Sequence, residues 1–205
     1  YQFLFKSKLD NAVKLRYSLN IGEPIGFARL MSGGTKAVVV TRKGNFIQKM
    51  ENQVYIIDLV TGDKQTIYSA DGQITGTTIN IQGTLLAFLE QNIRTYNVID
   101  LATLKPIFKQ QSVFPFLRAP IFTEDGRHLM FGGSMQDKGG SISVIDLSLT
   151  QEINKKNFSG SLRNIHPVAK SEVAFLINRE NSDFFYSIWN WKTGKVTVLF
   201  NEAGQ

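Results

Sequence analysis

One short phrase recurs along this chain at nearly even spacing, and it limits the fold more than any other feature of the sequence. Its four copies read VYIIDLVTG, YNVIDLATL, ISVIDLSLT and YSIWNWKTG. The polar centres of the copies are Asp58, Asp100, Asp146 and Asn190, which lie 42, 46 and 44 residues apart. Repeats of this length are typical of the four-stranded blades of β-propellers.

A second landmark precedes each copy, and it consists of a polar turn followed by an apolar strand. Its copies are SGGTKAVVV from Ser32, IQGTLLAFL from Ile81, EDGRHLMFG from Glu124 and AKSEVAFLI from Ala169. A further short run lies before each polar turn, and a fourth follows each Asp phrase. Because the two middle strands read as nearly continuous apolar runs, they need cover on both faces, which stacked sheets provide.

The beginning of the chain, QFLFKSKLDNAVKLRYSL, matches only the last two strands of a repeat. We therefore expect an all-β fold, a β-propeller of four complete four-stranded antiparallel blades plus the outer hairpin of a preceding blade. The expected limits are 1–21 for the hairpin and 22–73, 74–117, 118–161 and 162–205 for the blades. Since a propeller ring must close, we expect the missing blades in the same parent chain.

The acidic residues of the repeat have an expected structural role. A side-chain oxygen at Asp58, Asp100 or Asp146 can accept backbone N–H groups of the turn that follows it, as in an Asx turn. We therefore interpret these three aspartates as fold residues and not as catalytic acids.

The phrases IFTEDGRHLMF and VYIIDLVTG resemble the repeats of bacterial WD-like and TolB-type β-propellers. The resemblance extends over essentially the whole chain and implies an architecture with an interaction role, but no particular partner. The Gly-His and Trp-Asp dipeptides of standard WD repeats are absent, so their hydrogen-bond network is not expected here.

The composition argues against a disulfide-stabilised protein, a membrane-spanning protein and a nucleic-acid-binding protein. The chain has no cysteine, and no apolar run reaches the length of about 18–20 residues that spans a bilayer. Its net charge of +6 is spread along the sequence, so we do not expect nucleic-acid binding. Both the bacterial cytoplasm and the periplasm are compatible with these features, and we favour the periplasm.

Residues with catalytic chemistry are sparse. The two histidines, His128 and His166, are interpreted as structural or surface residues, and the sequence has no GxSxG elbow for a nucleophilic serine. Four glycines, at 132, 133, 139 and 140, bracket SMQDK and are predicted to form a flexible loop between strands. We predict no catalytic residue, no cofactor and no metal.

Loops that join second to third strands, or one blade to the next, lie on one rim of a propeller and vary most between these repeats. Two of them, TRKGNFIQKMENQ and QQSVFPFLR, combine aromatic and basic residues that suit a protein-binding hot spot. In the alternative interpretation, Phe114 and Phe116 fill gaps between blades. The candidate partner-binding residues are Arg42, Lys43, Phe46, Arg94, Phe114, Phe116 and Met135.

Two main functions follow from this reasoning. The first is a non-catalytic scaffold that binds a protein or peptide partner through its rim loops. The alternative is the propeller section of a larger enzyme, such as a prolyl-oligopeptidase-type hydrolase, whose propeller controls substrate access.

Overall fold

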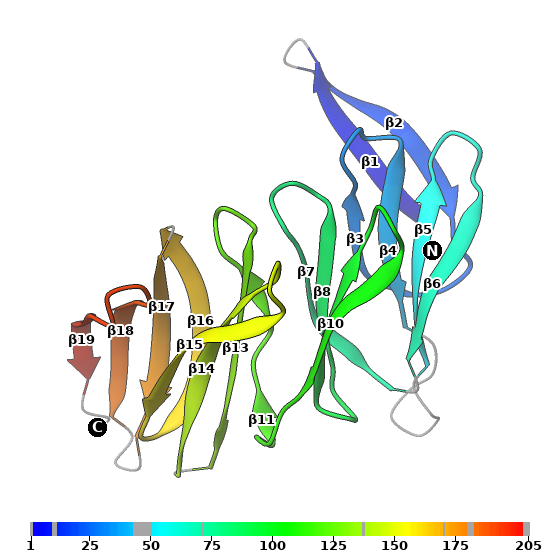
Figure 1. The fold of residues 1–205 in the computed structure, drawn as a ribbon. Helices are drawn as coiled ribbons and strands as arrows, with labels where there is room; N and C mark the ends of the chain where they lie inside the picture. Colours follow the sequence, from blue (N-terminus) through cyan, green and yellow to red (C-terminus); the bar gives the residue numbers. More distant parts are fainter. Residues whose placement is uncertain are drawn as a thin grey trace. The chain divides into compact units, whose positions relative to one another are not determined.

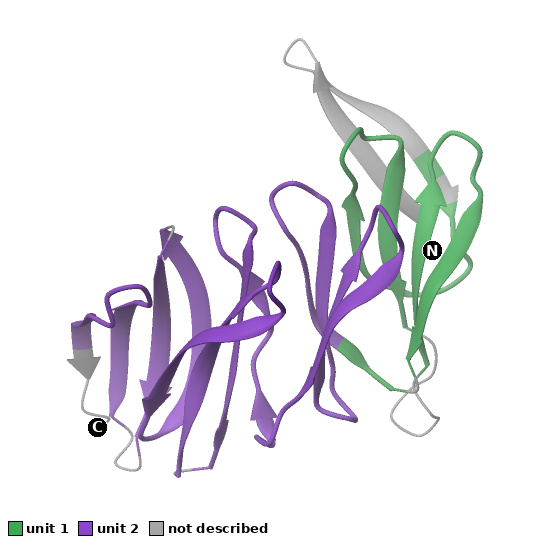
Figure 2. Cartoon of the chain, in the orientation of Figure 1, with its two compact units in different colours: residues 1–74 green, residues 75–205 purple. Residues whose placement is uncertain are grey.

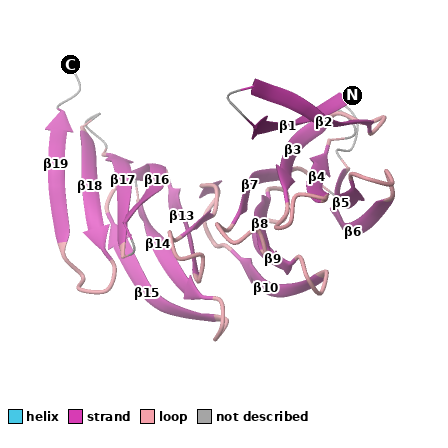
Figure 3. Cartoon of the chain, turned by 90° about the horizontal axis from the view of Figure 1, so that it is seen from above, coloured by secondary structure: helices cyan, strands magenta, loops and turns pink. Residues whose placement is uncertain are grey.

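The computed structural model describes residues 2–9, 12–42, 51–70, 72–136, 138–169, 171–179 and 183–202. The regular elements in these ranges are all β-strands (Figures 1 and 3). No helix in the described ranges has the length and apolar character needed to cross a bilayer. The chain divides into two compact units, Tyr1–Ile74 and Thr75–Gln205 (Figure 2).

The first unit contains a hairpin and one four-stranded antiparallel sheet. The hairpin pairs β1 (Gln2–Leu9) with β2 (Ala12–Asn20), and the first sheet follows chain order through β3 (Ile25–Leu30), β4 (Lys36–Thr41), β5 (Asn52–Asp58) and β6 (Lys64–Ala70). Val39, Tyr55 and Ile57 form the centre of its core. The Asn52 side chain links the start of β5 to the end of β4 and to residue 74. Its Nδ2 donates to Thr41 O at 2.6 Å, and its Oδ1 accepts from Ile74 N at 2.8 Å.

The second unit contains three antiparallel sheets. The second sheet consists of β7 (Ile74–Ile79, whose first residue closes the first unit), β8 (Leu85–Glu90), β9 (Thr95–Asp100) and β10 (Lys105–Gln111). The third consists of β11 (Phe116–Leu117), β12 (Ile121–Phe122), β13 (His128–Met135), β14 (Gly139–Asp146) and β15 (Gln151–Phe158). The fourth consists of β16 (Ser161–Ala169), β17 (Glu172–Asn178), β18 (Phe184–Asn190) and β19 (Val196–Glu202).

The third sheet is buried on both faces, as its apolar runs predict. Alternate residues of β13 point in opposite directions, so Phe131 joins a core with Tyr96 of the second sheet, whereas Met130 joins a core with Trp189 of the fourth. Each large apolar side chain buried in this way contributes about 1.5–3 kcal/mol to stability. The stacking of sheets is therefore what makes the long apolar strands stable in water.

The Asx turns predicted at Asp58, Asp100 and Asp146 are present, and Asn190 forms the same turn in the fourth repeat. Asp100 Oδ1 accepts from the backbone N–H groups of Ala102 and Thr103, both at 2.8 Å, and Asp58, Asp146 and Asn190 accept in the same way. The N–H of Thr103 is the main cause that holds the pKa of Asp100 below its ordinary value. This local pattern explains why the phrase recurs.

The residue four positions after each turn acceptor has a positive φ angle. It is glycine in two repeats, Gly62 with 82° and Gly194 with 77°, but Leu104 with 59° and Thr150 with 53° in the other two. Side chains with a Cβ rarely adopt this left-handed conformation, so the turns at Leu104 and Thr150 carry backbone strain.

Two details of the third sheet differ from the expectations. The first strand of this sheet, expected as one short run before the polar turn, consists of the two short strands β11 and β12, which both pair with β13. Pro120 lies between them and has no N–H to donate to a ladder, which explains the interruption.

The predicted flexible loop was also wrong, because all four glycines lie in strands, two in β13 and two in β14. A Cβ on Gly140 would lie 2.1 Å from Gly133 O, and a Cβ on Gly133 would lie 2.8 Å from both Phe114 Cβ and Phe116 O. These two glycines therefore permit a close approach of neighbouring strands and do not provide a hinge.

Candidate functional site

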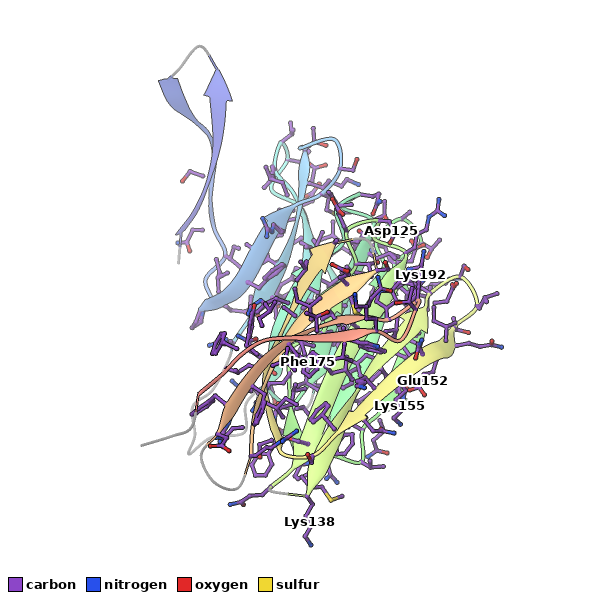
Figure 4. The ribbon with its side chains drawn as sticks, turned by 90° about the vertical axis from the view of Figure 1, so that its left-hand side faces the viewer. Asp125, Lys138, Glu152, Lys155, Phe175 and Lys192 are labelled. Atoms are coloured by element: carbon purple, nitrogen blue, oxygen red, sulfur yellow. The ribbon has the colours of Figure 1, made fainter. Side chains whose placement is uncertain are left out.

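The sheets of the second unit have two chemically different ends. We use the name rim for the end that carries the connections at 91–94, 112–115 and 159–160 and the connection between β13 and β14. We use the name turn end for the end that carries the Asx turns. In Figure 4, Lys138 marks the rim and Asp125 the turn end, at opposite ends of the third sheet.

Four candidate partner-binding residues lie on or next to the rim. Phe116 and Met135 are 47% and 41% exposed, and Arg94 is also exposed. Phe114 is half-buried and packs against the core shared by the second and third sheets, a position that suits the gap-filling interpretation for this residue. Phe116 therefore offers apolar surface at the rim, whereas Phe114 mainly supports the connection that carries it.

The other candidates belong to the first unit. Arg42 follows β4, is exposed, and donates its backbone N–H to Pro24 O at 2.8 Å. Lys43 and Phe46 lie outside the described residues. The structure accordingly gives no geometry for a patch formed by these three residues.

Arg118 was not identified by the sequence reasoning, although it joins all three sheets of the second unit. Its carbonyl accepts from the Tyr96 hydroxyl at 2.9 Å, its N–H donates to Gly132 O at 2.9 Å, and its Nε donates to Leu162 O at 2.8 Å. Burial lowers the pKa of Arg118 from its usual value. Arg118 therefore holds the segment between β11 and β12, close to the rim connection at 112–115, against all three sheets.

A pocket of about 140 Å³ opens beside this connection, between the second and third sheets. Its wall comprises residues from β10, the following connection, β13, β14 and β15, among them Gln110, Ser112, Phe114, Ser141, Ser143 and Lys155. The Phe131 ring stacks on Tyr96 with ring centroids 4.1 Å apart and makes the inner side of the pocket apolar. We call this cavity the interblade pocket.

A larger cleft of about 650 Å³ lies at the turn end of the same two sheets. His128 lies in it, with Nδ1 3.6 Å from Asp125 Oδ1 and Nε2 3.9 Å from Asp146 Oδ2. Its ring rests against Trp191 with centroids 4.9 Å apart. The arrangement places a serine, Ser148, and two acids near one histidine.

The hydrogen bonds in this cleft do not match those of a nucleophilic triad. In a triad the histidine accepts from the serine, but here Ser148 Oγ donates to Asp146 Oδ1 at 2.6 Å. That hydrogen bond, with two backbone N–H groups, holds the pKa of Asp146 below its ordinary value. Burial raises the pKa of Asp125, but hydrogen bonds from Thr123 and the Arg127 N–H outweigh it and lower the pKa overall. The carboxylates are thus occupied in turn formation.

Among the described residues, no set of three or more histidine, aspartate or glutamate side chains is arranged to hold a metal ion.

No protein-family model matches the chain, and a search of curated proteins gives no significant match. Solved structures are similar to it. Pyrococcus horikoshii acylaminoacyl peptidase matches with a TM-score of 0.63 and 18% identity, over 87% of this chain and 32% of the peptidase. The β-propeller domain of the Trilobed protease from Pyrococcus furiosus matches with a TM-score of 0.60 and 18% identity, over 89% and 58%. Porphyromonas gingivalis dipeptidyl peptidase 4 matches with a TM-score of 0.68 and 11% identity, over 94% and 35%.

These likenesses confirm the predicted β-propeller architecture, in which β11 and β12 together form the first strand of the third four-stranded sheet. At such identities the likeness shows the fold alone. The chain spans about a third of the length of the acylaminoacyl peptidase and of the dipeptidyl peptidase, so these propellers are parts of larger chains.

Proposed function

We propose that this chain is the non-catalytic propeller section of a larger peptidase and controls the access of peptides to catalytic residues carried elsewhere in that protein. One observation supports the proposal above others: propellers of peptidases match between 87% and 94% of this chain while the chain covers only about a third of two of those enzymes. The alternative function from the sequence is thereby favoured over a free-standing scaffold.

The geometry of the described residues supports the non-catalytic part of the proposal. Ser148, the serine beside His128 and two carboxylates, donates to Asp146 and not to the histidine. Because the pKa of both Asp125 and Asp146 is lowered, these carboxylates are weak bases near neutral pH. The peptide-cleaving chemistry of the proposed enzyme therefore belongs to other residues.

A scaffold that binds a protein partner is the second candidate. It is favoured by exposed apolar side chains at the rim, where Val113, Phe116 and Met135 are 74%, 47% and 41% exposed. Such residues surrounded by polar groups are common in protein-binding surfaces.

The decisive experiment uses the full-length protein that carries this chain. It is incubated with a peptidyl chloromethyl ketone, the labelled residue is located by mass spectrometry, and hydrolysis of short peptides is measured in parallel. We expect hydrolysis, and a label outside residues 1–205. A label within these residues would contradict the non-catalytic role, and the absence of both label and hydrolysis would favour the scaffold.

A further inference from the structure

We propose that the interblade pocket binds a carboxylate group of a peptide, either its free C-terminus or an acidic side chain. The pocket has about 140 Å³ of space, whereas a single water needs only about 10–15 Å³. It therefore accepts a group of the size of a carboxylate on a short stem. This inference goes beyond the proposed function and does not depend on it.

Two serine side chains in the pocket wall provide the first reason. Ser141 and Ser143 of β14 are 3% and 5% exposed and both line the pocket. Within the described ranges, no hydrogen bond of either side chain is recorded, and neither hydroxyl oxygen is among the enclosed polar atoms that lack a partner, so both hydroxyls face the open space of the pocket. A ligand that accepts hydrogen bonds from both hydroxyls would satisfy them.

Charge provides the second reason. Lys155 of β15 pairs with Ser143 across the antiparallel ladder, so both side chains point to the same face of the sheet. No aspartate or glutamate is found among the described residues of the pocket wall. Figure 4 shows Lys155 on β15 near Glu152, but the structure records no ion pair between them in its described part. The ammonium group is thus available to an anion.

The pocket is already formed in the absence of a ligand. Ser112 donates its backbone N–H to Arg94 O at 2.8 Å, and its Oγ accepts from Phe114 N at 3.2 Å, which fixes the connection that forms one wall. Gly133 pairs with Ser141 in the ladder between β13 and β14. Because glycine has no side chain, the space beside Ser141 stays open. Binding therefore needs little rearrangement, which lowers its entropic cost.

These features favour a singly charged carboxylate over a phosphate. Two hydroxyl donors and one ammonium match the two oxygens and the single negative charge of a carboxylate, and the described part of the wall contains no arginine for bidentate phosphate recognition. The exposed Val113 and the half-buried Phe114 lie beside the polar groups and can contact the stem of the ligand.

Binding is measured by isothermal titration calorimetry on the full-length protein, with three N-acetylated tripeptides and inorganic phosphate. The first peptide is acetyl-Gly-Gly-Glu-amide, the second is acetyl-Gly-Gly-Gly with a free C-terminus, and the third is neutral acetyl-Gly-Gly-Gln-amide. We expect binding of the first or second at least tenfold tighter than of the third, and their ratio identifies the source of the carboxylate. Equal binding of all three, or tighter binding of phosphate, would overturn the proposal.

Two matched variants locate the binding. Lys155→Met removes the ammonium and keeps the stem, whereas Lys156→Met makes the same change at the next residue, which pairs with Ile142 on the opposite face. We expect Lys155→Met to weaken carboxylate binding about tenfold and Ser143→Ala to weaken it several-fold, as loss of a charge-assisted hydrogen bond does. If Lys156→Met weakens binding as much as Lys155→Met, the weaker binding results from the lower net charge of the protein, and the interblade pocket is not the binding site.

Discussion

The Tyr96 hydroxyl is a sensitive test of how the second and third sheets are joined. Tyr96 is fully buried, and its Oη lies 2.9 Å from Arg118 O and 2.9 Å from Gly132 O. Gly132 O also accepts from Arg118 N, so it stays paired in Tyr96→Phe, whereas Arg118 O loses its recorded partner. The ring and its stacking on Phe131 are retained.

The expected loss follows from these contacts. An ordinary hydrogen bond contributes about 0.5–1.5 kcal/mol, and a buried carbonyl left without a partner adds a desolvation cost within about 1–3 kcal/mol. We expect Tyr96→Phe to lower the free energy of unfolding by about 1–2 kcal/mol, with an unchanged far-UV circular dichroism spectrum. Urea unfolding, followed by tryptophan fluorescence, measures this difference.

Tyr186→Phe is the matched control. Tyr186 stacks on Phe200 with centroids 5.5 Å apart, and no hydrogen bond of its hydroxyl is recorded in the described part of the chain. Its loss should remain within about 0.5 kcal/mol. If the two variants unfold at the same urea concentration, the Tyr96–Arg118 contact does not stabilise the junction between the sheets and the reasoning fails.

Two further predictions concern the Asx turns. Thr150→Gly should raise the free energy of unfolding by about 0.5–1 kcal/mol in urea unfolding, because the φ of 53° strains a β-branched residue, and a neutral or negative change would argue against strain. Asp100→Asn keeps an acceptor oxygen, as Asn190 does naturally, and should cost less than about 0.5 kcal/mol at pH 7, whereas Asp100→Ala should cost about 1 kcal/mol. Because the folded pKa of Asp100 is lowered, its stabilisation is present above the unfolded pKa of about 3.9 and is lost as the pH falls through the folded pKa. Unfolding of Asp100→Asn should therefore depend less on pH below about 4 than that of the wild type, and equal slopes would refute this assignment.

The sequence predicted the features that depend on local patterns. The spacing of Asp58, Asp100, Asp146 and Asn190 identified the repeat because each turn is closed by hydrogen bonds to residues two and three positions ahead. Continuous apolar runs likewise predicted strands that are covered on both faces. Local hydrogen bonding and burial therefore sufficed for the fold class.

The features that the sequence did not predict depend on distant segments. Arg118 donates a hydrogen bond to Leu162, which is 44 residues away in the sequence. No local sequence pattern around Arg118 indicates this contact. The four glycines of β13 and β14 were predicted to form a loop because glycine is common in loops. Their close contacts with neighbouring strands depend on the tertiary fold and cannot be recognised from their spacing. Pro120 was a signal for the interrupted inner strand that the sequence reasoning did not use.

The polar groups at the two ends of the sheets are used differently. At the turn end, Asp125 and Asp146 accept hydrogen bonds from neighbouring backbone and hydroxyl groups, so folding itself occupies them. In the interblade pocket, by contrast, the hydroxyl groups of Ser141 and Ser143 have no recorded protein partner in the described ranges and face the pocket space. Because folding leaves these hydroxyls without a protein partner, they remain able to donate hydrogen bonds to a ligand in the pocket. Replacing both serines by alanine should then leave stability unchanged or improve it while carboxylate binding is lost, which separates a binding role from a structural one.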